Sequence, residues 1–530
     1  MSSLANDAEA RHARRGFLFI TGAKGWFLVC GTLLNLSLPR LLGDPVQFGD
    51  FGLVNTLIAV LNAVMVAGVL QAVSKRTSEQ PEAARLVRAS ALRLQSAVGG
   101  VTLGLLVVLA EPLCALIFGD PTLAPYLRIA AVVTGVYAVY AALIGVINGM
   151  GRFALQAAFD VAFASLKLVL MVGLVLAGYG VEGALGGFAI TALIVALVAF
   201  RVTGRIVPPA PVGHVSPPLV GFLAQVMGYV FFINVLLQAD LFIVKEAAFE
   251  PVRTALAAGQ TAWLTGLVDV STLAPGADLA REATSALAGL FKATKNVSLI
   301  PYQAVVAIAF VVFPLISRST FQSDRAATRT YVFQAVRTST LLVFLLATLI
   351  AAGGDTLLDR FFGAAYTIAA PALLPLLAAT AAFAIFYVLA SILTAAGHPL
   401  DALGLAASAA VLELAILHPV ISESPPGGVL LLRAALVVLG ANVAALAAAG
   451  LVLSRRLGVA LPLLSFARAT VSSAAALAVA GWVPGHGLAL IFVRALVAGV
   501  TFLAMAWTTR EITRADLALV RSTLSRSPQA

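Results

Sequence analysis

Four lysines and two aspartates lie within apolar stretches of this sequence, where charged side chains are rare. They are Lys24, Lys167, Lys292 and Lys295, with Asp160 and Asp240. An ionisable residue inside a membrane span is costly and by default marks a transport pathway. Lysine offers phosphate a compact positive charge. We therefore predict that the four lysines line a cavity and attract an anionic phosphate group.

Spacing places pairs of these residues on shared helix faces. Asp160 and Lys167 are two helical turns apart, and Lys292 and Lys295 are one turn apart. We interpret Asp160 and Asp240 as charge partners of the lysines or as residues that bind a coupling ion. The structural alternatives are an Asp160–Lys167 contact, and lysines whose heads reach the membrane surface.

Transmembrane helices must position these residues. Hydrophobic residues make up 61% and charged residues 11% of the 530 positions, whereas soluble proteins carry about 25% charged residues. This composition excludes a soluble enzyme, a disordered chain and a fibrous protein. A transmembrane helix needs about 20 residues, and fourteen apolar segments approach or exceed that length. They are residues 16–38, 51–73, 90–117, 125–148, 153–177, 181–203, 218–244, 286–316, 331–353, 370–396, 401–421, 428–453, 466–483 and 487–509.

The fold class is therefore an all-α polytopic membrane protein, and a weak internal repeat indicates its organisation. Phe118-Gly119 and Phe362-Gly363 each precede a helix that ends in a turn containing glycine. Because six helices separate the repeats, both have the same membrane orientation. We predict two pseudo-symmetric six-helix bundles plus two C-terminal helices. The predicted parts are an N-terminal tail at 1–15, a bundle at 16–205, a linker at 206–217, a bundle at 218–455 with an outer loop at 246–285, two additional helices at 456–509 and a C-terminal tail at 510–530.

The net charge of +10 indicates membrane orientation rather than nucleic-acid binding. Most basic residues fall in alternate loops, which the positive-inside rule assigns to the cytoplasm. Both termini are then cytoplasmic, no cleavable signal peptide is evident, and the 246–285 segment lies outside. That segment fits either a surface amphipathic helix or a tolerated insertion.

Several functional motifs are missing from the sequence. It contains no GxxxxGK[ST] loop for nucleotide phosphates, no HExxH motif and no Cys/His cluster. Cys30 and Cys114 sit in apolar runs, as expected of small core residues. We expect no catalytic residue, metal or cofactor, so the chain is predicted not to be an enzyme. Transport would draw on an ion gradient, the membrane potential or a substrate gradient.

Five segments resemble the MOP (multidrug/oligosaccharidyl-lipid/polysaccharide) exporter superfamily, and within it the Wzx-type oligosaccharide-lipid flippases. They are LPRLLGDPVQFGDFGLVNTL at 38–57, GVLQAVSKR at 68–76, INGMGRF at 147–153, LQADLFIVK at 237–245 and GLFKATKNVSLIPYQAVVAIAFVVFPLISRS at 289–319. The resemblance implies that the chain moves an undecaprenyl-pyrophosphate-linked oligosaccharide from the inner to the outer leaflet of a bacterial inner membrane, by alternating access. The implied partners are that lipid-linked oligosaccharide, membrane lipids and a glycan polymerase or other assembly proteins.

Three other functions compete with this interpretation. A lipid II flippase of the same superfamily would need more basic cavity residues than this chain offers. A multidrug/cation antiporter would need an acidic cavity, whereas the apolar segments here carry more lysines than carboxylates. A membrane glycan polymerase or ligase would need catalytic residues in a large outer loop, and the 246–285 segment contains no histidine.

Overall fold

The computed structural model describes residues 2–208, 220–268, 278–321, 324–485 and 487–512 of the chain. Within these ranges the chain is helical and has no β-strand, which confirms the predicted all-α class. Most of the predicted linker at 206–217 and nearly all of the tail at 510–530 lie outside the described residues.

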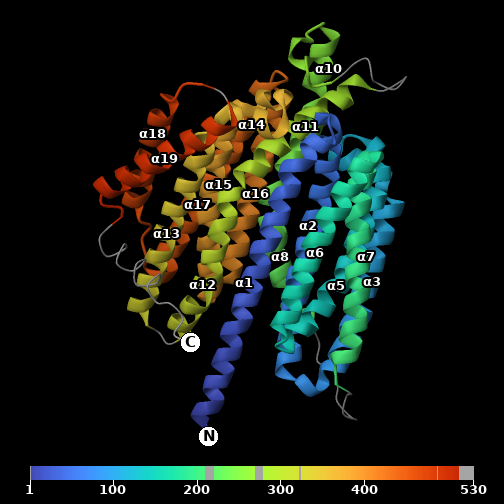
Figure 1. Cartoon of the computed structure of the whole chain (residues 1–530), viewed down its shortest axis with the longest axis vertical. Coiled ribbons are helices and arrows are strands. Elements are labelled where there is room, and N and C mark those ends of the chain that lie inside the picture. The colour runs from blue at the N-terminus through green and yellow to red at the C-terminus, as the bar shows by residue number, and fades with distance from the viewer. Residues whose placement is uncertain (1, 209–219, 269–277, 322–323, 486, 513–530) are drawn as a thin grey trace. The chain divides into compact units, whose positions relative to one another are not determined.

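The helices follow the chain in the order shown in Figure 1. Those of the first half are α1 (Ser2–Leu41), α2 (Pro45–Glu79), α3 (Ala84–Val108), α4 (Ala110–Phe118), α5 (Ala124–Gly149), α6 (Phe153–Leu174), α7 (Gly180–Ile206), α8 (Val220–Gln238), α9 (Asp240–Ala247) and α10 (Phe249–Ala257). Those of the second half are α11 (Leu279–Ser298), α12 (Ile300–Phe321), α13 (Arg325–Ala351), α14 (Gly354–Phe362), α15 (Ala370–Ala395), α16 (Pro399–Ser422), α17 (Gly428–Leu457), α18 (Leu463–Gly481) and α19 (Leu488–Thr508). Short helical turns are η1 (Pro81–Ala83), η2 (Pro121–Leu123), η3 (Val175–Tyr179), η4 (Ala262–Leu264) and η6 (Ala364–Ala369).

The helices confirm a multi-pass membrane protein. In the described part of the chain, 10 helices are long and apolar enough to cross a membrane, or 11 if one bent pair is a single span. One of these runs, Phe153–Ile206, contains both α6 and α7. They separate at Gly178 (φ +92°) and Gly180 (φ +50°), where glycine tolerates a left-handed backbone. Each of the fourteen predicted segments coincides with a helix or a pair of consecutive helices.

Three segments predicted as single helices are instead broken. Segment 90–117 divides into α3 and α4, segment 218–244 into α8 and α9, and segment 286–316 into α11 and α12. Pro301 explains the third break, because proline has no amide hydrogen and is tolerated in the first turn of a helix. The predicted outer loop at 246–285 contains α10, η4 and the beginning of α11.

The chain divides into two compact units. The first unit comprises Met1–Ala293 and Glu413–Leu430, and the second comprises Thr294–Leu412 and Leu431–Ala530. In the first unit α5 packs against α2, α3 and α7, and α6 packs against α1 and α7. The predicted pair of six-helix bundles stays a prediction.

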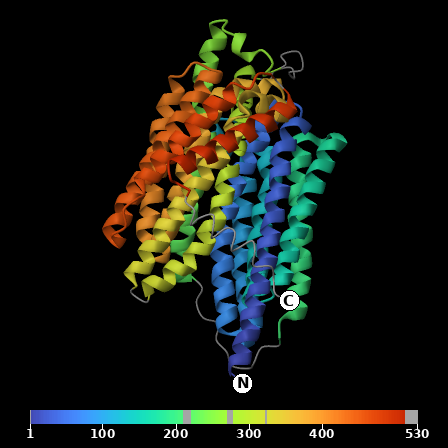
Figure 2. The same ribbon diagram turned by 60° about the vertical axis from the view of Figure 1, so that its left-hand side comes forward.

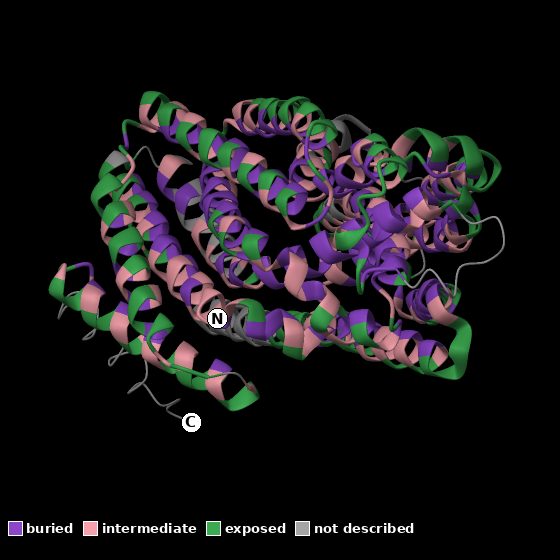
Figure 3. Cartoon of the chain, turned by 90° about the horizontal axis from the view of Figure 1, so that it is seen from above, coloured by how far each residue is buried: buried purple, intermediate pink, exposed green. Residues whose placement is uncertain are grey.

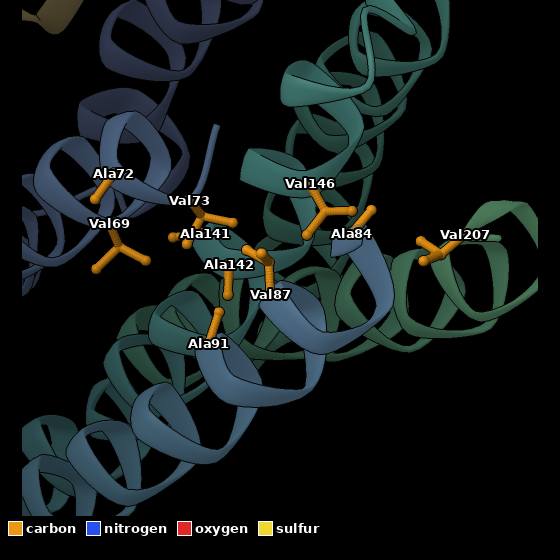
Figure 4. Packing of buried hydrophobic residues seen from close by; sticks show 10 residues of the cluster. All are labelled: Val69, Ala72, Val73, Ala84, Val87, Ala91, Ala141, Ala142, Val146 and Val207. Atoms are coloured by element: carbon orange, nitrogen blue, oxygen red, sulfur yellow. The ribbon is translucent and has the colours of Figure 1, made fainter. Parts of the chain in front are cut away.

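Small residues bring the helices of the first unit close together. Figure 4 shows one such core, where valines and alanines of α2, α3 and α5 meet. A side chain at Gly145 or Gly149 of α5 would collide with α2, because Val73 and the carbonyl of Ser74 occupy that space. Close backbone approach supplies the van der Waals contact that holds membrane helices together.

The second unit has a buried central helix and a lipid-facing edge. The α15 span is 83% buried, whereas only 17% of the α19 span is buried. Helices α18 and α19 pack on each other and on α13, as Figure 2 shows for the red C-terminal helices. Seen from above in Figure 3, buried positions follow one side of many helices and exposed positions the other. This pattern is expected where lipid replaces water around the bundle.

Candidate transport site

The first unit contains a cluster of aromatic rings and charged side chains on four helices. Its members are Lys24 and Phe27 of α1, Tyr137 and Tyr140 of α5, Asp160, Phe163 and Lys167 of α6, and Phe188 of α7. We call this set the aromatic–lysine cluster. Spacings of three, four and seven positions place the members from each helix on one face of that helix.

An ion pair joins α1 to α6 in this cluster. The Nζ atom of Lys24 lies 2.9 Å from Oδ2 of Asp160, and the Lys24 side chain is 60% exposed while that of Asp160 is 12% exposed. Two positions further along α1, the indole Nε1 of Trp26 donates a hydrogen bond of 2.9 Å to Oγ of Ser165. The lysine head is therefore accessible to a ligand although its partner carboxylate is held inside.

Aromatic rings surround Phe163. Its ring centroid lies 6.4 Å from that of Phe27, 5.5 Å from that of Tyr137, 6.0 Å from that of Tyr140 and 6.3 Å from that of Phe188. Stacked and edge-to-face pairs at these separations are favourable. The rings present flat apolar surfaces in this part of the unit, together with the hydroxyls of Tyr137 and Tyr140.

Two further polar groups belong to the cluster. The Nζ atom of Lys167 lies 3.6 Å from the ring centroid of Phe188, which is close enough for a cation–π interaction. The hydroxyl of Tyr140 is buried and has no hydrogen-bond partner among the described residues. A buried polar atom without a partner is unusual and indicates a place for water or a ligand group.

A second charged set in the first unit was not assigned from the sequence. We call it the lysine network, and its side chains are Asp50 of α2, Asp120 between α4 and η2, Lys245 of α9 and Ser285 of α11.

Lys245 is the centre of the lysine network. Only 2% of the surface of Lys245 is exposed. Its Nζ atom donates to Oδ2 of Asp120 at 3.0 Å, to the carbonyl oxygen of Arg281 at 2.9 Å and to Oγ of Ser285 at 2.6 Å. The Ser285 hydroxyl in turn donates to Oδ1 of Asp50 at 2.6 Å. An ammonium has three donors, so every proton of Lys245 has an acceptor.

Local structure explains the position of Asp120. Gly119 ends α4 in a left-handed conformation (φ +65°), and Asp120 then accepts a hydrogen bond from the backbone amide of Thr122 at 3.1 Å. Burial alone would raise the pKa of Asp120, but the Lys245 ammonium and the hydrogen bonds from Thr122 and Lys245 lower it below its usual range. Asp120 is therefore ionised at neutral pH and pairs with a charged lysine.

Glycines bring α2 and α11 into backbone contact beside the network. A Cβ atom at Gly49 would collide with the carbonyl of Ser285, and one at Gly289 would collide with the carbonyl of Pro45. One turn further, the stem of Lys292 passes over Gly52.

The head of Lys292 also contacts α2. Its Nζ atom donates a hydrogen bond of 2.9 Å to Oγ1 of Thr56. Thr56 lies one turn beyond Gly52 on α2, so Lys292 packs along this helix and extends the contact between α2 and α11.

The structure brings some of the predicted site residues together. Lys24 pairs with Asp160, and Lys167 lies in the same cluster against the Phe188 ring; an Asp160–Lys167 contact was only the structural alternative. Asp240 is fully buried at the start of α9, where its carboxylate accepts a hydrogen bond from the amide of Leu241. Lys295 is also buried. That the four lysines line one cavity stays a prediction.

The sequence contains a separate local feature near three members of the lysine network, but nothing that links these residues to one another. Lys245 closes the segment LQADLFIVK, and Asp120 follows a glycine that ends a helix. Asp50 lies within a segment that carries the family resemblance. Nothing in the spacing indicates that residues so far apart in the chain meet.

Comparisons with known proteins show a family similarity in part of the chain and a shared fold. Residues 37–250 match the model of a family described as "Polysaccharide biosynthesis protein". No curated protein matches the chain. The fold is similar to that of lipid II flippase MurJ in an inward closed conformation, with a TM-score of 0.70 and 12% identity over 93% of this chain and 99% of that one.

Two further solved structures share the fold. One is a multidrug resistance MATE family transporter in an inward-facing conformation, with a TM-score of 0.58 and 14% identity over 83% of this chain and 94% of that one. The other is a MOP superfamily transporter from Pyrococcus furiosus, described as having a binding pocket of reversed polarity. It has a TM-score of 0.55 and 15% identity over 84% of this chain and 95% of that one. Residues 37–250 are thus similar to polysaccharide biosynthesis proteins, and the chain shares its fold with solved transporters of the MOP superfamily.

Proposed function

We propose that this chain is a flippase that moves an undecaprenyl-pyrophosphate-linked oligosaccharide from the inner to the outer leaflet of a bacterial inner membrane. The family description, polysaccharide biosynthesis, and the fold shared with a lipid II flippase support a lipid-linked substrate. Transport proceeds by alternating access between the two predicted bundles, with both termini cytoplasmic. The chain provides a route and does no covalent chemistry.

The aromatic–lysine cluster is the observation that carries this proposal. Pyrophosphate and sugar are too polar to cross a bilayer core unaided, because their desolvation costs too much. Lys24 offers an exposed ammonium for the phosphate. The rings around Phe163 offer flat apolar surfaces, which suit the C–H faces of a sugar ring.

The buried carboxylate of Asp160 gives this site a way to change its charge. With Lys24 paired to Asp160, the cluster carries the single unpaired charge of Lys167. A bound phosphate competes with Asp160 for Lys24, and the carboxylate is then free to bind a coupling cation. Lys292, Lys295 and Asp240 extend the same polar route, as the sequence predicts.

Complementation of a bacterial strain that lacks its oligosaccharide-lipid flippase tests the proposal. The wild-type chain restores surface glycan, whereas Lys24→Ala, Lys167→Ala and the Lys292→Ala/Lys295→Ala double variant accumulate the inner-leaflet intermediate. Lys75→Ala is the matched control, because Lys75 pairs with Glu79 at the end of α2 and both side chains are exposed. Expression and membrane insertion are matched by immunoblot.

Each outcome separates one part of the proposal from another. If the lysine variants all complement, the function holds and the site assignment is wrong. If the wild type is inserted but exports no glycan, reconstituted protein is tested with fluorescent lipid-linked oligosaccharide, lipid II and a cationic drug. Movement of lipid II or drug alone would replace the proposed substrate with one of the two rival substrates.

A further inference from the structure

A cavity of about 330 Å³ lies in the first unit between the beginning of α3 and the end of α7. Its lining is distinct from both charged sets described above. The lining residues are Arg85, Arg88, Phe200, Arg201, Gly204 and Val207. Three of the six lining residues are therefore arginines.

The charge of this cavity is not neutralised by protein. Among the described residues, none of the three arginines forms an ion pair with a carboxylate. Arg88 is held in place, since its Nε donates to Oγ1 of Thr203 at 3.0 Å and its Nη2 to the carbonyl oxygen of Phe200 at 3.0 Å. Its guanidinium also lies 4.8 Å from the Phe200 ring centroid. Arg85 and Arg201 are exposed.

The backbone around the cavity suits an anion as well. Arg85 and Arg88 lie near the beginning of α3, where the helix dipole is positive. On α7, Arg88 donates to the carbonyl oxygen of Phe200, which lies six residues before the end of that helix. A Cβ atom at Gly204 would lie 3.7 Å from Nη2 of Arg88, so a larger side chain at this position would extend toward the fixed guanidinium.

The cavity opens onto an apolar helix face. Both α3 and α7 belong to candidate membrane spans. Along α7, leading away from the cavity, Leu193, Leu197 and Phe200 are 48%, 53% and 48% exposed. A matching ligand therefore has a negative head for the arginines and a long apolar tail for α7.

We propose that this cavity binds the phosphate headgroup of an anionic phospholipid, with its acyl chains along α7. Basic pockets between transmembrane helices on the cytoplasmic side recognise such headgroups, and the charge distribution predicts that these helix ends are cytoplasmic. The lipid would be a bound partner of the first unit, separate from the transported substrate.

Native mass spectrometry of the full chain in detergent tests this site, with phosphatidylglycerol as the probe and phosphatidylcholine as the uncharged comparison. The Arg85→Gln/Arg201→Gln variant weakens phosphatidylglycerol binding by on the order of tenfold and leaves phosphatidylcholine binding unchanged. Arg88 is left intact because it also ties α3 to α7.

Two further variants distinguish a specific binding site from nonspecific electrostatic attraction. Arg93→Gln/Arg205→Gln removes two exposed arginines from the same helices outside the cavity lining and retains binding. Gly204→Leu keeps every charge but fills the cavity, and it weakens binding. The proposed site would be wrong if both double variants lost phosphatidylglycerol binding equally. It would also be wrong if Gly204→Leu bound the lipid as well as the wild type. Full displacement of the lipid by millimolar inorganic phosphate would overturn a lipid as the occupant.

Discussion

The aromatic–lysine cluster and the lysine network contain the same kind of ion pair in opposite surroundings. The Lys24 side chain is 60% exposed and has one carboxylate partner, whereas the Lys245 side chain is 2% exposed and all its protons are accepted by protein groups. A saturated buried ammonium cannot bind a ligand without losing a protein partner. The exposed ammonium can. We therefore predict that burial and hydrogen-bond saturation, rather than residue type, distinguish a structural lysine from a binding one.

Among the variants that test this comparison, Lys245→Ala is expected to lose the most stability. Lys245→Ala leaves Asp120 buried without its cation, so the free energy of unfolding falls by about 3–5 kcal/mol. Thermal unfolding in detergent measures the loss. Asp120→Asn/Lys245→Met removes both charges and recovers part of it. If Lys245→Ala is as stable as the wild type, the lysine network does not stabilise the fold.

A smaller effect is expected where α2 meets α11. Gly49→Ala places a methyl group against the carbonyl of Ser285, and the helices must shift apart at a cost of about 1–3 kcal/mol. The matched control is Gly100→Ala in α3, because a Cβ atom there meets nothing within 4 Å. Unfolding temperatures of the two variants are compared, and equal values would contradict close packing at Gly49.

Acid should weaken the lysine network selectively. Because the folded-state pKa of Asp120 is lowered, the stability it contributes is present above its unfolded pKa of about 4 and disappears as pH falls through the lower folded value. The unfolding temperature of the wild type therefore drops below about pH 4. In Asp120→Asn/Lys245→Met the unfolding temperature should fall less steeply with decreasing pH. If it falls as steeply as in the wild type, Asp120 is not the cause of the acid sensitivity.

The smallest effect on stability is expected at Lys24. The Lys24 head is exposed although Asp160 is buried, so water replaces the ammonium beside the carboxylate when Lys24→Ala removes it. The expected cost is about 1 kcal/mol, which lowers the unfolding temperature by about 1–2 °C, while glycan export is lost. Export is measured in the complementing strain and stability in detergent. Loss of both properties together would place Lys24 among the structural lysines and remove the distinction drawn here.

Sequence alone predicted the helices well and the site in part. Apolar length identified each membrane segment, because a span must satisfy its backbone hydrogen bonds internally. Spacing within one helix placed Asp160 and Lys167 on a common face. It could not show that Asp160 pairs with Lys24, since that contact depends on how α1 and α6 pack.

The lysine network was beyond prediction for the same reason. Its members come from four separate segments, and the breaks that orient them, between α4 and η2 and between α8 and α9, lie within or beside stretches predicted as continuous helices. Asp240 was chosen from LQADLFIVK, whereas Lys245 of that segment is the residue that the structure places at the centre of the lysine network.

The long sequence separations in the lysine network have a consequence for biogenesis. Asp120 precedes Lys245 by 125 residues, and Asp50 precedes Ser285 by 235 residues. At typical synthesis rates Asp120 waits roughly 6–25 seconds for its partner. During that interval two carboxylates are held at the membrane with no ammonium to pair with. A nascent chain that stops before α9 never acquires the Lys245 ammonium, so it cannot complete this network.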